Sequence, residues 1–583
     1  MRYILKVAKY YPQWIILILA LIFNYGLRLL LLKPDGHDYF YEFPFARSVR
    51  YSDYLFQKWN LVLAAVLVGI IWLWKEKKIF RDIRQNIPYI IIIALVTLAV
   101  HWFSFQRWFE FDDYRVIGHH YAVTGTPKQN EMGAGNSYFY GIGMIYLVVS
   151  WFGTKFELYN GLGLTIYFLT GVVIFAIANK FQKDKFISLT TALFFITSPT
   201  YWRQTLLMLE LLGDGFKLLL FSLSIYFLLS RYYSGAIIFA AAALEFGISR
   251  THFIAWPLLL MSILFVRKNN QENWKWIIAC IFFMAMSLSY IPLMGHFSPQ
   301  ILDGKNWLNN WPQIMRMADM IFGITIPHGI SHTLIYFLQW LFGYKYTSTL
   351  LGFLITVGLA VLTLWLFRKR KFLAAQLILT GLFIVVAAII FPTLMGIRLL
   401  TDIHKLTWQY KDSLPAGPTA YGAFSTFGFI FILLGISKVL RQKLFIKILV
   451  ILILLNSFTV IKADKEWIEE VSGPQRITNE QLAKILPADG QVKIIYTPKP
   501  TQVLSRYIYN FYQLYRIKEP IYSSTDTDEF ISLINQYKPN KEKIYLLTLN
   551  TDNYVIYDNS DKLRIYEPTK LTPSSVEAIL KSL

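Results

Sequence analysis

Two adjacent carboxylates, Asp112 and Asp113, stand near the start of the stretch Phe109–Pro127, which follows an apolar segment. A carboxylate held at the edge of a bilayer is costly unless it is paired, hydrated or used. Either acid could serve as a general base that takes the proton of a hydroxyl acceptor. The alternative for both residues is a solvated position in a loop.

A second acid, Asp214, lies between Gly213 and Gly215 just before another apolar segment. Glycines on both sides allow the backbone to approach another group closely. A second carboxylate near the first would assist a general base, directly or through a metal ion. The alternative is a charge at a helix boundary, paired with Lys217 three residues later.

Basic residues follow in two further stretches, Leu244–His252 and Ile397–Lys411. The side chains that could bind an anion there are Arg250, His252, Arg398, His404 and Lys405. A phosphate group at a membrane surface needs donors of this kind. The alternative is that these long side chains extend from helix ends toward water.

The composition indicates what kind of scaffold carries these residues. Of the 583 residues, 55% are hydrophobic and only 16% are charged, whereas soluble chains carry about a quarter charged residues. One soluble core could not bury this much apolar surface, because cores stop growing at about 250–300 residues. The single cysteine, Cys280, excludes an intrachain disulfide.

Apolar segments of about the length that crosses a bilayer, roughly 17–25 residues, recur along the first 461 residues. The sequence therefore predicts a polytopic α-helical membrane protein with about thirteen spans. They lie near 12–32, 59–74, 88–105, 157–178, 186–200, 215–230, 234–249, 251–266, 274–292, 347–367, 372–393, 418–436 and 444–461. Within the long loops between spans, 138–151 and 337–342 are predicted to lie on the membrane surface.

The formal charge of +21 gives the orientation. If the N-terminus is inside, the inner loops collect twenty-three basic and four acidic residues, whereas the rest of 1–461 carries eighteen basic and sixteen acidic ones. Lys and Arg concentrate in cytoplasmic loops. We therefore expect the acidic stretches on the outer face, and the excess charge does not indicate nucleic-acid binding.

The last part of the chain, 462–583, is neutral, with sixteen basic and sixteen acidic residues. Its pattern alternates predicted strands, at 491–497, 520–523, 543–549, 554–557 and 563–566, with predicted helices at 501–516, 526–537 and 572–583. The sequence thus predicts two domains, a membrane domain at 1–461 and an extracytoplasmic α/β domain at 462–583. The second contains no catalytic motif, so we expect it to be structural or to recognise the acceptor.

Three stretches together resemble the GT-C superfamily of glycosyltransferases, most closely its protein O-mannosyltransferase and aminoarabinose transferase-like group. They are DDYRVIGHHYAVTG after one span, SPTYWRQTLLMLELLGD before another, and LEFGISRTH between two spans. The pattern departs from the family at its start, where two extra spans and the loop 33–58 come first. Asp38 and Asp53 of that loop therefore compete for the role of base.

The resemblance implies an integral membrane enzyme of the plasma membrane that transfers a sugar, with inversion, from a polyprenyl-phosphate donor to a hydroxyl on a protein, lipid or glycan. Asp113, or else Asp112, would be the base, and Asp214 would hold the acceptor or, with Asp113, a divalent cation such as Mg²⁺ or Mn²⁺. The five basic residues named above would bind the donor phosphate. Competing hypotheses are a membrane transporter or lipid flippase, and a polysaccharide polymerase or ligase of another fold.

Overall fold

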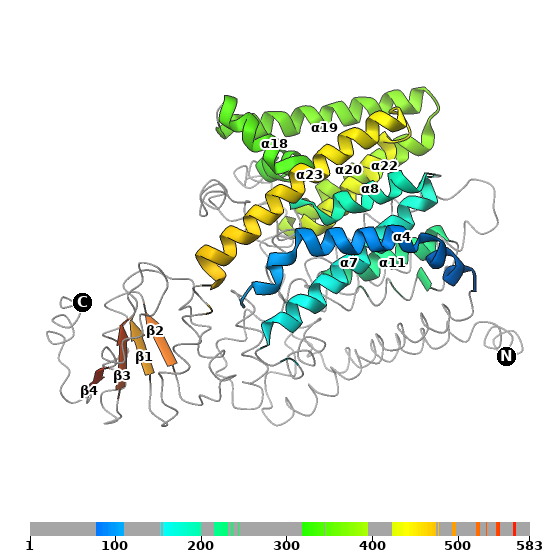
Figure 1. The fold of residues 1–583 in the computed structure, drawn as a ribbon. Helices are drawn as coiled ribbons and strands as arrows, with labels where there is room; N and C mark the ends of the chain where they lie inside the picture. The colour runs from blue at the N-terminus through cyan, green and yellow to red at the C-terminus, as the bar shows by residue number, and fades with distance from the viewer. Residues whose placement is uncertain are drawn as a thin grey trace, which may run out of the picture.

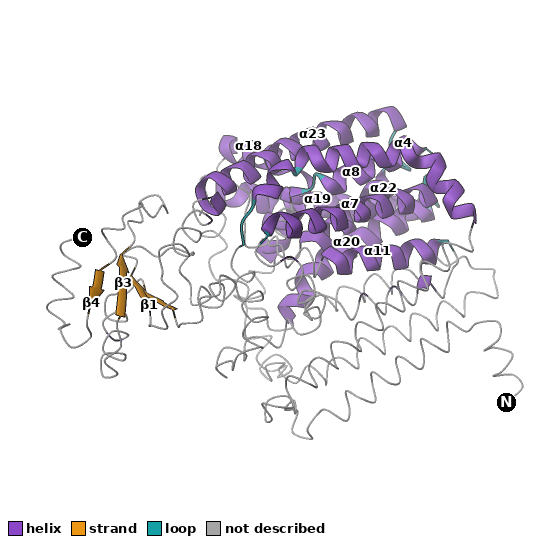
Figure 2. Cartoon of the chain, turned by 60° about the horizontal axis from the view of Figure 1, so that its bottom comes forward, coloured by secondary structure: helices purple, strands orange, loops and turns teal. Residues whose placement is uncertain are grey.

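A computed structural model describes residues 77–109, 155–182, 184–199, 215–230, 318–342, 344–394 and 422–473. It also describes the strand residues 493–496, 521–524, 544–548 and 564–566, and the single positions 152, 235, 236, 239, 243, 476 and 532. The described part is a bundle of helices with a small separate group of strands (Figures 1 and 2).

The first helices form an antiparallel group. α4 (Lys77–Val100) ends in the short 3₁₀-helix η2 (Trp102–Gln106), and α7 (Phe156–Phe181) turns back through α8 (Lys185–Ile196). The turn between α7 and α8 is sharp because the side chain of Asp184 caps α8, accepting a hydrogen bond from the Phe186 amide at 2.7 Å. α11 (Phe216–Leu229) packs along α7.

The later helices pack on this group. The π-helix η8 (Asp319–Thr325) leads into α18 (Ile326–Phe342), followed by α19 (Tyr344–Arg368), α20 (Phe372–Leu394), α22 (Gly422–Ile436) and α23 (Gln442–Trp467). A second π-helix, η10 (Ile468–Ser472), continues from α23. α20 and α22 approach each other closely at Gly381 and Gly428. A Cβ on Gly428 would stand only 2.7 Å from the Gly381 carbonyl oxygen. Small residues permit such an approach between apolar helices.

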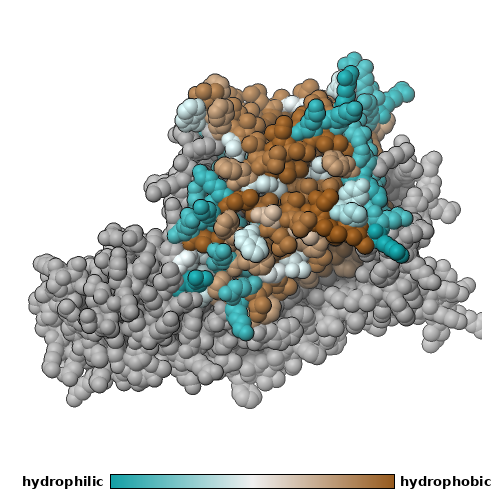
Figure 3. All heavy atoms as spheres, in the orientation of Figure 1, coloured by the Kyte–Doolittle hydropathy of each residue, from teal (hydrophilic) through white to brown (hydrophobic). Residues whose placement is uncertain are grey.

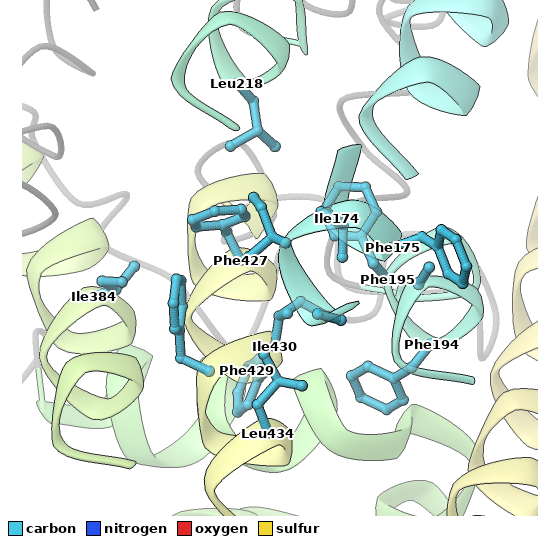
Figure 4. Packing of buried hydrophobic residues seen from close by; sticks show 14 of the residues in the cluster. Ile174, Phe175, Phe194, Phe195, Leu218, Ile384, Phe427, Phe429, Ile430 and Leu434 are labelled. Carbon is cyan, nitrogen blue, oxygen red and sulfur yellow. The ribbon is translucent and has the colours of Figure 1, made fainter. Parts of the chain in front are cut away.

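The core lies where α7, α8, α11, α20 and α22 meet. Its buried side chains are aromatic and branched, and Figure 4 shows Ile174, Phe175, Phe194, Phe195, Leu218, Ile384, Phe427, Phe429, Ile430 and Leu434 pointing toward one another. Hydroxyl groups inside these helices bond to the carbonyl four residues earlier, as Thr170 does to Ile166 at 2.8 Å. This arrangement satisfies the hydroxyls without a partner outside the helix.

Within the part of the chain that the structure describes, three helices are long and apolar enough to cross a membrane, namely 156–181, 347–368 and 442–467. On the face shown in Figure 3, a band of hydrophobic side chains covers the bundle, bordered on both sides by hydrophilic residues. Exposed members include Leu95 on α4, Leu364 on α19 and Leu454 on α23, each at least 60% exposed. An apolar surface of this extent is expected where lipid is the solvent.

Seven of the predicted spans correspond closely to helices of the structure: α7, α8, α11, α19, α20, α22 and α23. α4 begins eleven residues before the predicted start at 88 and continues through Pro88, which removes one helical hydrogen bond. The segment 337–342, predicted on the membrane surface, is the exposed end of α18. The predicted spans at 12–32, 59–74, 251–266 and 274–292, and most of 138–151 and 234–249, lie outside the described residues.

The four described strands, β1 (Lys493–Tyr496), β2 (Ile521–Ser524), β3 (Ile544–Thr548) and β4 (Arg564–Tyr566), form one sheet in the order β2-β1-β3-β4. β1 is parallel to both β2 and β3, and β4 is antiparallel to β3. Each lies within or one residue beyond a predicted strand. The predicted strand 554–557 and most of the helices predicted between strands fall outside the described residues. The predicted domain boundary after residue 461 falls inside α23.

Candidate functional site

The bundle has two ends that differ in the charges they carry. We name them the Arg107 end, where α4, α8, α20 and α23 finish and α7, α11 and α22 begin, and the Lys438 end opposite to it. In Figure 1, the Arg107 end is on the left, where α23 turns from yellow to orange. The strands lie beyond that end.

Contacts between distant segments fix the Lys438 end. Lys438 donates a hydrogen bond to the Phe181 carbonyl, and Gln182 Nε2 donates to the Leu434 carbonyl at 3.3 Å. The Lys180 ammonium stands 5.1 Å from the ring centre of Tyr226 on α11. The exposed basic residues described here are Arg84, Lys180, Arg368, Lys369, Arg370, Lys371, Arg441, Lys443 and Lys447.

At the opposite end, the charges of Arg107 and Asp464 are buried. Their side chains form an ion pair with no exposed surface, and the second carboxylate oxygen of Asp464 accepts a hydrogen bond from Ser104 Oγ at 2.9 Å. The two residues are 357 positions apart in the chain. Asp464 is therefore committed to holding η2 against the end of α23, and we assign it no role as a base.

Backbone groups around Arg107 are held as well. Asn160 of α7 donates its amide to the Arg107 carbonyl at 3.0 Å, and the Trp108 amide donates to Ser472 Oγ at 2.5 Å. Two distant segments, α7 and the end of α23 with η10, thus converge on two consecutive residues. Because buried backbone groups need partners, these bonds define the path by which the chain leaves η2.

Aromatic rings extend this anchor to Phe109. Its ring lies 5.2 Å from that of Trp108 and 5.4 Å from that of Tyr159, both in edge-on arrangements. Trp108 packs in the same way against Phe156 at 5.1 Å. Phe109 is fully buried, so the last described residue before Asp112 and Asp113 has a fixed position.

The predicted acids themselves lie outside the described residues, but the chain limits how far they stand from this end. An extended chain spans at most about 3.6 Å per residue, so the Cα of Asp112 lies within about 11 Å of that of Phe109, and that of Asp113 within about 14 Å. Asp214 is bonded to Gly215, at the start of α11. All three acids are thus tied to the Arg107 end.

The predicted phosphate-binding residues also lie outside the described residues. Arg398 follows Leu394, the last residue of α20, by four positions, so its Cα lies within about 14 Å of the same end. His404 and Lys405 are ten and eleven positions from Leu394, so the chain length sets no useful limit on their distance from the Arg107 end. The same holds for Arg250 and His252, for which the nearest described residue is Ala243.

No family model matches the chain, and no curated protein matches it either.

Two described features add to the predicted site. Lys217, which the sequence pairs with Asp214, is fully buried in the first turn of α11. An ammonium group removed from water requires a compensating charge or hydrogen bonds. The sequence alone cannot separate this from an exposed lysine at a helix end.

The second feature is a histidine pair on α18 that the sequence analysis missed. His328 and His332 are both buried, and their Nδ1 atoms are 2.8 Å apart. The available signal was the spacing of four residues, which brings side chains together on a helix. Among the described residues, no group of three or more His, Cys, Asp or Glu side chains is placed to hold a metal ion.

Proposed function

We propose that this chain is an integral membrane glycosyltransferase of the GT-C type, with its chemistry at the Arg107 end. The observation that carries the proposal is the separation of charge in the bundle. The segments with Asp112, Asp113, Asp214 and Arg398 are joined to one end, and most of the exposed lysines and arginines among the described residues stand at the other. Lys155, Lys462 and Lys465 are the exceptions, and the last two pair with Glu466 and Glu469. The resemblance of the first two segments to the acidic loops of that superfamily supplies the reaction.

The positive-inside rule gives the orientation of the proposed enzyme. The Lys438 end would face the cytoplasm, and the Arg107 end would face outward in a plasma membrane crossed many times. Because α23 finishes at the Arg107 end, the sheet and the rest of the C-terminal part would also lie outside. A lipid-linked sugar would present its head group to the outward side.

In the proposed reaction, Asp113 or Asp112 takes the proton of the acceptor hydroxyl while its oxygen attacks the anomeric carbon of the sugar. The bond from that carbon to the phosphate oxygen breaks, and polyprenyl phosphate leaves with the electron pair. Attack from the opposite side inverts the anomeric configuration. Cations from Arg250, His252, Arg398, His404 and Lys405 would stabilise the phosphate before and after the bond breaks.

Asp214 has a supporting role in this proposal. It would orient the acceptor, or bind a divalent cation together with Asp113, because carboxylate oxygens are the ligands that Mg²⁺ and Mn²⁺ prefer. Lys217, three residues later in the chain, is fully buried, and a carboxylate close to its ammonium would offset that charge.

The test is transfer of labelled sugar by the purified protein in lipid nanodiscs, with a panel of polyprenyl-phosphate sugars and hydroxyl acceptors. The double variant Asp112→Asn with Asp113→Asn should lose transfer by at least about 100-fold, the lower range for loss of a general base, while it still inserts and still binds the donor. The control is Glu469→Gln, which neutralises an exposed carboxylate at the same end.

Full transfer by the double variant would contradict the assignment of the base. Donor binding without any sugar release, together with movement of the lipid between leaflets, would instead favour the flippase hypothesis. Thermal stabilisation by the donor distinguishes both results from a protein that does not recognise polyprenyl phosphates.

A further inference from the structure

The histidine pair of α18 lies deep in the bundle and has no part in the proposed reaction. The rings of His328 and His332 have their centres 4.7 Å apart, and each side chain is more than nine-tenths buried. A hydrogen bond between two Nδ1 atoms requires one donor and one acceptor. The Nδ1 atom that accepts this bond therefore directs its lone pair at the other ring.

The position of the pair is set by a break in α18. Ser331 has φ −163° and ψ 114°, an extended conformation inside the helix. Gly329 lies directly against the ring of Phe429 on α22, so no larger residue fits there. α22 therefore holds the turn that presents the two histidines.

Asn456 of α23 supplies a third group at this turn. It is fully buried, and its Nδ2 donates to the carbonyl of Ile330, between the two histidines, at 3.2 Å. Its Oδ1 atom has no hydrogen-bond partner in the part of the chain that the structure describes. A buried carbonyl oxygen without a partner is costly, so a bound group that uses it is expected.

We propose that His328, His332 and the Asn456 Oδ1 atom form a site for a divalent transition metal ion such as Zn²⁺. Imidazole nitrogen is the most common protein ligand of such ions. With metal–nitrogen bonds of about 2.0–2.1 Å, two nitrogens on one tetrahedral ion stand about 3.3 Å apart. The observed 2.8 Å needs to open by only about half an ångström, which small rotations of the rings provide.

One described cation, Lys462, acts on His332. Its side chain is half exposed and its ammonium lies 3.5 Å from the Glu466 carboxylate, which offsets part of its charge. All three protein ligands are neutral, so a bound ion keeps its full charge. Its remaining positions would take water or an anionic oxygen such as that of a phosphate. The site is eight residues, or about 12 Å along α23, from Asp464.

The experiment measures binding of Co²⁺ and Zn²⁺ alone to the purified full-length protein. Co²⁺ bound at the site should give visible absorption bands typical of nitrogen ligands, and Zn²⁺ should displace it with a stoichiometry of one. The variants His328→Gln and His332→Gln should each weaken binding at least 10–100-fold, the loss expected when even an outer-shell partner is removed. His296→Gln serves as a matched control and should bind like the original protein.

Asn456→Asp distinguishes the site from a histidine hydrogen bond that serves only packing. A carboxylate at this position should tighten metal binding, and added Zn²⁺ should raise the unfolding temperature of this variant more than that of the original protein. The proposal would be overturned if the original protein bound neither ion. It would also be overturned if both glutamine variants bound the metal as tightly as the original protein does. Neither outcome depends on glycosyltransferase activity.

Discussion

The two ends of the bundle treat charge in opposite ways. At the Lys438 end, most lysines and arginines, such as Arg368, Lys369 and Lys443, are exposed. At the Arg107 end, a guanidinium and a carboxylate are fully buried against each other, between segments 357 residues apart. Exposed basic residues are the usual marker of topology in membrane proteins, whereas a buried pair constrains structure.

This difference separates residues that report orientation from residues that hold the proposed site. Exposed charges at the Lys438 end can be replaced one at a time with little effect on folding. Arg107 and Asp464 cannot be replaced singly in this way, because loss of either charge leaves the other charge buried without a counterion in a low-dielectric interior. The loop with Asp112 and Asp113 begins at the constrained end.

The largest effect should come from Asp464→Leu, which leaves the Arg107 guanidinium buried without its counterion. Breaking one half of a buried pair costs about 3–5 kcal/mol, so this variant should lose most of its folded yield or unfold at a much lower temperature. Thermal unfolding followed by size-exclusion chromatography in detergent measures it.

Restoring charge balance sharpens the result. Adding Arg107→Met to Asp464→Leu should recover much of the loss, because an apolar pair of similar volume replaces a buried ion pair at little cost. Lys443→Ala at the opposite end is the comparison and should change little. A single Asp464→Leu variant as stable as Lys443→Ala would remove the distinction between the two ends.

An intermediate effect is expected where α20 and α22 connect the two ends. Gly428→Ala places a Cβ 2.7 Å from the Gly381 carbonyl oxygen, so the helices must separate. Overpacking of this kind costs about 1–3 kcal/mol. The control is Gly358→Ala on α19, where a Cβ would have no neighbour within 4 Å.

The control should behave in the opposite direction. Alanine is favoured over glycine inside a helix by up to about 1 kcal/mol, so Gly358→Ala should raise the unfolding temperature slightly. Equal responses of the two variants would show that α20 and α22 do not depend on close contact at Gly428.

The smallest effect should appear at the turn between α19 and α20. Arg370 has φ 58°, in the left-handed region, and the Lys371 amide bonds back to the Leu366 carbonyl at 2.9 Å, as at many helix ends. Arg370→Gly should stabilise the fold by about 0.5–1 kcal/mol, because glycine adopts this conformation without strain. Lys369→Gly, one residue earlier, should not be stabilising, and the same unfolding assay compares them.

The sequence predicted the described helices well where apolar runs are long. α7, α11 and α20 begin and end within three residues of their predicted limits, because a span is a local property of composition. For α18, the sequence predicted only the last six residues, 337–342, and not the preceding part of the helix. Its Pro327, Gly329 and Ser331 are typical of a loop, and packing against α19, α22 and α23 favours the helix in this segment.

The anchor at the Arg107 end could not be predicted in the same way. Asp464 follows the last apolar run and was assigned to the C-terminal domain, since polar composition begins there. Its partner is 357 residues away, and no local pattern links the two. The residues of the proposed active site were chosen from motifs, and chain connectivity ties Asp112, Asp113, Asp214 and Arg398 to one end without giving the distances between them.

The claim that the Arg107 end faces outward can be tested directly by labelling single cysteines in intact cells. After Cys280→Ser removes the only native cysteine, Glu469→Cys places an exposed thiol at the Arg107 end and Lys443→Cys places one at the Lys438 end. A membrane-impermeant maleimide should label position 469 in intact cells and position 443 only after lysis. Labelling of position 443, or of both positions, in intact cells would contradict the account.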